Sequence, residues 1–175
     1  TKLKFESAST EGDNAGVAVS GKALLAEIAH NGEDLQGRVY AKKQDAEFGL
    51  GQQSASQSGT RKLGAEARYK MTERTSVDAL AYREENLTTQ ATRNVTEANV
   101  SYAQEAYSLT AGARMARDVD GSGQKLDSDL LLLGASTQLI DNKLRLRANS
   151  ENALSSANDS FDYPSRYIVG ADYSL

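Results

Sequence analysis

Alternation between apolar and polar residues with a period of two limits the fold of this chain more than any other feature. It is clearest between Arg61 and Asn86, where charged or small residues separate regularly spaced apolar ones. The apolar positions at the start of this stretch are Leu63, Ala65, Ala67, Tyr69 and Met71. Successive side chains of a β-strand point to opposite faces of a sheet. The stretch therefore predicts strands with one apolar face and one charged face.

The same period recurs along most of the chain and predicts about ten strands in a single domain, residues 1–175. One competing helix, at residues 21–29, is rich in Ala, Leu and Glu, but its neighbours alternate and we favour a strand there. Large side chains that could fill a soluble core are scarce, because the chain has no Trp and only three Phe. The sequence thus predicts an all-β protein without an obvious buried core.

The links between the predicted strands alternate in length. Tight links are expected at Asn31–Glu33, Thr72–Thr75, Gln104–Ala106 and Asp141–Asn142, and longer polar links at residues 48–60, 84–94, 118–127 and 150–165. Transmembrane barrels have this layout, with short turns on one rim and long loops on the other. The two ends of a soluble sandwich are equivalent, so such regularity is not expected of one.

We therefore predict an antiparallel, up-and-down transmembrane β-barrel of about ten strands, either complete or part of a larger barrel. The residues expected to face lipid are Leu63, Ala65, Ala67, Tyr69, Met71, Leu109, Met115, Leu144, Leu146, Tyr167, Val169 and Tyr173. Those expected to line the pore are Glu66, Arg68, Lys70, Asp78, Arg114, Arg145 and Arg147. A guanidinium turned toward mid-bilayer costs about 2–4 kcal/mol, so a slip of one residue would be strongly disfavoured.

Parts of the chain resemble the strand–turn–strand units of Gram-negative outer-membrane β-barrels, most of all the barrel regions of large, repeat-bearing surface proteins. The resemblance rests on "STQLIDNKLRLRANSENAL", "DYPSRYIVGADYSL", "DALAYREENL" and "SLTAGARMARD". It implies a barrel in the bacterial outer membrane that acts as an anchor or a pore for a surface or secretion system. No catalytic residue carries over. Barrels of this family normally end on an aromatic residue, whereas this sequence ends at Leu175. We therefore also expect further strands from a larger protein or from other protomers.

Composition narrows the partners. The net charge is −4, with both signs scattered along the chain, so no basic stripe suggests nucleic acid. The absence of cysteine removes disulfides, thiolate metal sites and cysteine nucleophiles. Outer-membrane lipid is the partner that the pattern predicts.

The sharpest local motif is "DVDGSGQKLDSD" at residues 118–129. Read as a calcium loop, it has Asp118, Asp120 and Ser122 at the first alternate positions and Asp129 at the last. A polar hairpin rich in turn residues is the simpler interpretation. The motif nevertheless defines an alternative, a soluble extracellular antiparallel β-module of adhesin-like type with a calcium-binding loop.

Chemistry of the enzymatic kind has little support in the sequence. His30 is the only histidine, and it lies beside "NGE" at a predicted turn, where no nucleophile accompanies it. A barrel enzyme acting on lipid or peptide is the least favoured hypothesis. We expect no catalysis and no cofactor.

Overall fold

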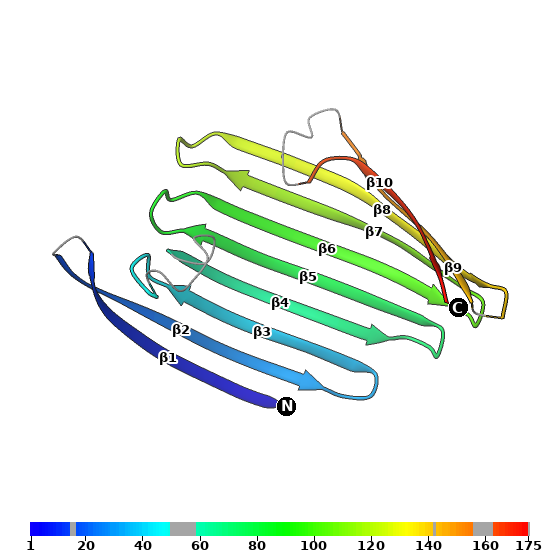
Figure 1. Ribbon diagram of the computed structural model, residues 1–175, viewed down its shortest axis with the longest axis horizontal. Helices are drawn as coiled ribbons and strands as arrows, with labels where there is room; N and C mark the ends of the chain where they lie inside the picture. The colour runs from blue at the N-terminus through cyan, green and yellow to red at the C-terminus, as the bar shows by residue number, and fades with distance from the viewer. Residues whose placement is uncertain (15–16, 50–58, 142, 156–162, 175) are drawn as a thin grey trace.

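The computed structural model describes residues 1–14, 17–49, 59–141, 143–155 and 163–174. These residues form ten β-strands (Figure 1). They are β1 (Lys2–Asn14), β2 (Val17–Asn31), β3 (Leu35–Gln44), β4 (Thr60–Lys70), β5 (Thr75–Asn86), β6 (Thr92–Ala103), β7 (Tyr107–Val119), β8 (Lys125–Leu139), β9 (Leu144–Ala153) and β10 (Arg166–Tyr173).

All ten strands belong to one sheet in the order β1 to β10, and each is antiparallel to its neighbours. This confirms the all-β, up-and-down prediction, and residues 21–29 lie inside β2 as expected. The sheet is open, because β1 bonds only to β2 and β10 only to β9. In Figure 1 it is a single twisted layer with both chain termini at the same end of the strands. None of the described residues forms a helix long and apolar enough to cross a membrane.

The register of the strands defines two chemically different faces. Ala65 on β4 lies opposite Val39 on β3 and Ala81 on β5. Its neighbour Glu66 lies opposite Arg38 and Leu80. Directly opposed residues share a face of the sheet. We call the side that carries Ala65 the apolar face and the side that carries Glu66 the polar face.

The apolar face is bare. Leu3 is 80% exposed and Val169 is 84% exposed. Among the large apolar side chains that the strands leave exposed, Ile168 alone lies on the polar face. Conversely, the strand residues Val95, Ala116, Leu130 and Leu132 are buried on the polar face. A soluble protein covers its apolar surface, and here the small core lies on the charged side.

The links also divide by end. At one end the intervals between consecutive strands are residues 32–34, 71–74, 104–106 and 140–143, which we call the short links. At the other end they are residues 15–16, 45–59, 87–91, 120–124 and 154–165. The predicted tight links are therefore right to within a residue or two, but the long links predicted at 84–94 and 118–127 are wrong in extent. Most of those residues belong to strands, because cross-strand ion pairs such as Lys62–Glu84 (2.9 Å) and Arg93–Asp118 (2.9 Å) accompany the ladder beyond the apolar band.

Candidate functional site: the polar face and the arm that crosses it

The structure places the predicted pore-lining residues on one face. Register puts all seven on the polar face, namely Glu66, Arg68, Lys70, Asp78, Arg114, Arg145 and Arg147. The predicted lipid-facing residues lie together on the apolar face, namely Leu63, Ala65, Ala67, Tyr69, Leu109, Met115, Leu144, Leu146, Tyr167, Val169 and Tyr173. Met71 follows the end of β4 and is 55% exposed in the link. The two-residue period thus sorted these side chains correctly into two sets.

Ion pairs run across the polar face of β2 to β5. Arg38 donates from Nε and Nη2 to the two carboxylate oxygens of Glu66, both at 3.0 Å, and its Nη1 lies 3.7 Å from Glu27. On the adjacent row Arg68 makes a similar two-point contact with Asp78, at 2.6 and 3.2 Å. These bidentate pairs fix the guanidinium planes and leave a charged but nearly neutral surface.

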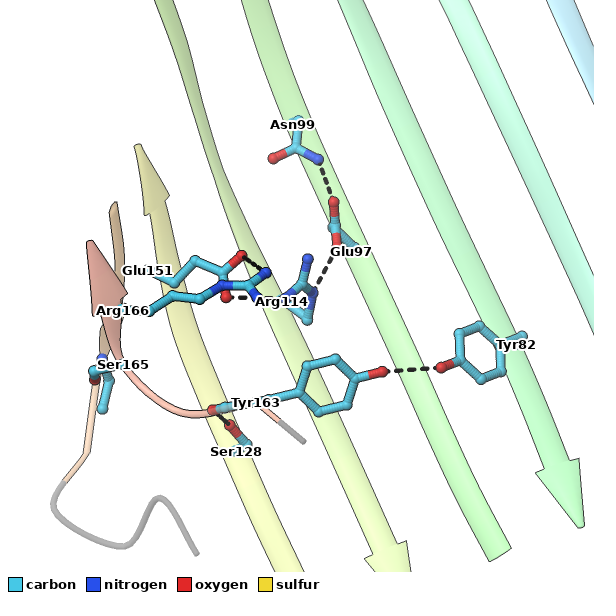
Figure 2. Close-up of polar contacts among 10 residues, drawn as sticks. Tyr82, Glu97, Asn99, Arg114, Ser128, Glu151, Tyr163, Ser165 and Arg166 are labelled. Atoms are coloured by element: carbon cyan, nitrogen blue, oxygen red, sulfur yellow. Dashed lines mark hydrogen bonds and ion pairs between the residues drawn. The ribbon is translucent and has the colours of Figure 1, made fainter. Parts of the chain in front are cut away.

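A second cluster joins β6, β7, β9 and β10 (Figure 2). Arg114 lies at its centre, with Nε 2.6 Å from Glu97 and Nη1 3.4 Å from Glu151. Glu97 also accepts a hydrogen bond from Asn99 at 2.6 Å, and Glu151 accepts one from Arg166 at 2.8 Å. The Arg114 side chain is only 16% exposed although it belongs to a single-layered sheet. Something other than a second sheet therefore covers this cluster.

Part of the cover is a short segment that precedes β10, Tyr163 to Ser165, which we call the tyrosine arm. The hydroxyl of Tyr163 lies 3.0 Å from that of Tyr82 on β5, and its carbonyl oxygen accepts a hydrogen bond from Ser128 on β8 at 3.1 Å. The guanidinium carbons of Arg93 and Arg114 lie 5.5 and 5.1 Å from the centre of its ring. Both distances are within the range of cation–π attraction. The arm thus lies across the polar face from β8 toward β5 (Figure 2).

Buried residues surround the point where the arm contacts the sheet. Ser128 is 1% exposed, and Leu130, Ala116 and Val95 on the same face are exposed by 0%, 0% and 2%. Leu130 and Leu132 therefore point to the polar face, while their neighbours Leu131 and Leu133 point to the apolar one. These buried residues form a small core on the polar face, and the tyrosine arm packs at this core through Ser128.

Residues 45–49, which follow β3, also fold onto the polar face. A side-chain carbon built on Gly21 would lie 2.2 Å from the backbone nitrogen of Phe48, so only glycine permits this approach. The amide of Gly49 donates to the hydroxyl of Thr10 at 3.0 Å. Asp45 accepts from the amide of Lys22 at 3.1 Å. A hydrogen bond from Lys43, together with that amide, lowers the pKa of the Asp45 carboxyl. The two described segments that fold back onto the sheet, Tyr163 to Ser165 and the residues around Phe48, therefore both lie on the polar face.

The residues of the predicted calcium loop are not gathered around one point. Asp118 and Asp129 lie on opposite faces of the sheet, where they pair with Arg93 at 2.9 Å and Arg117 at 2.6 Å. Asp120 instead accepts hydrogen bonds from Ser122 and from the amide of Gln124, and closes the turn. The described part of the chain holds no group of three or more acidic, histidine or cysteine side chains placed to hold a metal.

Sequence reasoning missed the residues that organise the second cluster. Arg93, Glu97 and Glu151 occupy alternate positions of strands, so the two-residue period could have found them. Nothing in the sequence marks Tyr163, because a link residue has no periodic neighbours. His30 lies on the apolar face beside the hydroxyl of Thr1, at 3.0 Å, so it is no base for a nucleophile on the polar face.

The polar face thus presents paired charges, hydroxyls and backbone groups that can form hydrogen bonds with water and polar solutes. A scan against protein-family models finds no match to this chain, and a search of curated proteins finds no significant match.

Proposed function

We propose that the chain forms the wall of an outer-membrane β-barrel, with the apolar face against lipid and the polar face toward a water-filled lumen. Its work is anchoring a larger assembly or passing a polar solute. Shape and lumen charge perform this work, without catalysis. Outer-membrane lipid is its principal partner.

The observation that carries this proposal is the tilt of the apolar band across the sheet. On β2 the band consists of Leu24, Ala26 and Ile28, and on β8 of Leu131, Leu133 and Ala135. A row of directly opposed residues begins at Ala26 on β2. This row reaches β8 at Asp127, through Ala41, Leu63, Arg83, Asn94 and Arg117. The middle of the band on β8, Leu133, is six residues away, after six steps between strands.

The band therefore moves by about one residue per strand. Strands of a closed barrel are tilted to its axis, so a slab of constant depth crosses each strand at a shifted position. A soluble sheet buried under another layer has no reason to offset its apolar residues in this way. A planar slab of lipid around tilted strands accounts for the offset directly.

A line of tyrosines on the apolar face is also offset by about one residue per strand. Tyr69, Tyr102, Tyr107 and Tyr173 lie on the apolar face toward the short links. The row of directly opposed residues through Tyr69 on β4 reaches β10 at Tyr167. Tyr173 lies six residues beyond Tyr167, and β10 is six strands beyond β4, so the tyrosines are also offset by one residue per strand. Aromatic residues gather at the interfaces of transmembrane barrels. The tyrosines thus support the same slab, with its border on the side of the short links.

The two described segments that fold onto the polar face fit this proposal. The tyrosine arm and the segment around Phe48 both lie on the polar face. Inside a barrel they would occupy the lumen and leave the lipid surface free. The arm would narrow a passage beside Arg93 and Arg114, where an ion or polar solute would meet aromatic and guanidinium groups.

A single Trp residue tests the orientation, because the chain has no natural one. Val100 and Ser101 are adjacent on β6 and point to opposite faces. We expect brominated lipids to quench the fluorescence of Val100→Trp strongly in vesicles, and that of the matched variant Ser101→Trp weakly. Equal quenching in both variants would contradict the proposed orientation.

A solution experiment separates the membrane barrel from the soluble module. We expect strand-type circular dichroism and a monodisperse size-exclusion peak only in detergent. A compact monomer in plain buffer would overturn the proposal and favour the soluble alternative, which calcium titration would then examine.

A further inference from the structure

The two edges of the open sheet carry complementary chemistry. Each edge strand presents unpaired backbone groups on its outer side, since β1 bonds only to β2 and β10 only to β9. Such edges are not tolerated in hydrocarbon. Ten strands that alternate in direction leave β1 and β10 antiparallel to each other, so the two edges can form the same kind of ladder as the other pairs.

We propose that β1 pairs with β10 of the same chain and closes a ten-stranded barrel, in the register that places Lys4 directly opposite Asp172. This inference rests on the proposed function and specifies how the barrel is completed. Its partner is the chain's own second edge, not another molecule.

The tilt of the apolar band limits the register. A shift of about one residue per strand amounts to about ten residues around ten strands. With Lys4 opposite Asp172, a row of directly opposed residues that starts on β1 and passes once around the barrel returns to β1 about ten residues from its starting point. This displacement equals the total shift of the apolar band. The two faces must also match, so neighbouring registers differ by two residues. The competing registers therefore place Lys2 or Glu6 opposite Asp172.

Charge separates these three registers. The Arg147 side chain lies over Gly170, because a side-chain carbon built there would be 2.6 Å from its Nε, and Arg147 also pairs with Asp172 at 3.2 Å. In the proposed register Lys4 meets Asp172 and Glu6 lies opposite Gly170, against the Arg147 guanidinium. Both contacts are attractive.

Each neighbouring register creates a repulsive contact. With Lys2 opposite Asp172, Lys4 would lie opposite Gly170 and against Arg147. With Glu6 opposite Asp172, two carboxylates would face each other. Like charges directly opposed on a sheet are destabilising. On the apolar face, the proposed register sets Phe5 beside Ala171, which joins the band of β1 to that of β10.

Disulfide trapping tests the register without background, because the chain has no cysteine. Asp172→Cys is combined in turn with Lys2→Cys, Lys4→Cys and Glu6→Cys in the full chain refolded in detergent. We expect mild oxidation to cross-link the Lys4→Cys pair within one molecule at least several-fold more completely than the other two. Leu3→Cys, on the opposite face, serves as the matched negative control.

The possible results distinguish a wrong register, the absence of closure and the failure of the proposed function. Cross-links only between two molecules would show that the edges join separate copies and would overturn the inference, as would preferential linkage through Lys2→Cys or Glu6→Cys. A protein that shows strand circular dichroism in detergent but no cross-link in any pair overturns closure alone. A protein without ordered strands in detergent overturns the proposed function as well.

Hydrogen exchange of the unsubstituted protein gives a second reading. In a closed barrel every backbone amide in the β1–β10 ladder is protected. In an open sheet the outward amides of both edge strands exchange freely, and that result would overturn closure even if a cysteine variant misfolded.

Discussion

The hydroxyl of Tyr163 lies within hydrogen-bonding distance of the hydroxyl of Tyr82, at 3.0 Å, although 81 positions separate the two residues in the sequence. Tyr82 belongs to β5, and the backbone of Tyr163 is held by Ser128 on β8. The contact between the two hydroxyls is visible in Figure 2. Together with the guanidinium groups of Arg93 and Arg114 beside the Tyr163 ring, it fixes the tyrosine arm against the polar face.

If the polar face lines a passage, as we propose, removing the ring of Tyr163 should widen that passage. Tyr163→Ala loses one hydrogen bond of about 1 kcal/mol and two cation–π contacts of about 0.5–1 kcal/mol each. We expect a higher single-channel conductance in planar bilayers, and a smaller increase for Tyr82→Phe, which loses only the hydroxyl contact. Tyr40→Phe is the control, because Tyr40 is also on the polar face and its ring packs over Gly64. Unchanged conductance in Tyr163→Ala would mean that the arm does not narrow the conducting path.

The cluster around Arg114 should contribute more to stability than an exposed ion pair on the same sheet. Arg114→Gln leaves Glu97 and Glu151 facing each other without their shared cation, and all three side chains are less than 20% exposed. Breaking such a partly buried pair should cost about 3 kcal/mol. Arg61→Gln, at a pair whose arginine side chain is 59% exposed, should cost less than about 1 kcal/mol. Urea unfolding in detergent or lipid measures both values, and equal costs would contradict the difference in burial.

A charge on the apolar face should be tolerated far less than the same charge on the polar face. Ala113 lies in the middle of the apolar band on β7, with Ala98 and Leu131 beside it. Ala113→Arg should destabilise the protein in lipid vesicles by about 2–4 kcal/mol. Thr110→Arg, on the polar face of the same strand, is the matched variant and should cost little. Similar unfolding midpoints for the two variants would contradict lipid contact on the apolar face.

Charge on the wall of the proposed lumen should set ion selectivity. Arg145 and Arg147 lie on the polar face of β9, toward the short links. Arg145→Glu combined with Arg147→Glu should shift the reversal potential in a salt gradient toward cation selectivity, because anions would replace two cations near the path. The double Gln variant should shift it about half as far. An unchanged reversal potential in both would remove these residues from the conducting path.

Acid should open the turn between β7 and β8. The hydroxyl of Ser122, followed by the amide of Gln124, lowers the pKa of the Asp120 carboxyl. A carboxyl whose pKa is lower in the folded state stabilises that state above its unfolded value of about 3.9, and the effect is lost as pH falls through the lowered folded pKa. The amide resonances of Ser122 and Gln124 should therefore titrate below pH about 3.9. Asp120→Asn should abolish this titration, and a midpoint above the ordinary aspartate value would contradict the hydrogen-bonded geometry.

The strand pattern could be predicted from sequence because each strand carries its own period. The alternation from Leu63 to Tyr69 assigns faces without any knowledge of neighbours, and the register places those faces together. The ends of β5, β6, β7 and β8 could not be predicted in the same way. Residues such as Glu84 and Asp118 look like loop residues in isolation, and they remain in strands because partners on adjacent strands neutralise them.

The sequence by itself determined ten strands, their two faces and the side on which charge gathers, because side-chain alternation is a local property of the extended chain. Only the tertiary structure decided the drift of the apolar band, since register relates residues that lie far apart in the sequence. It also decided the separation of Asp118 from Asp129 and the position of Tyr163 over Arg93 and Arg114. These features depend on hydrogen bonds and ion pairs between different strands, which no local pattern specifies.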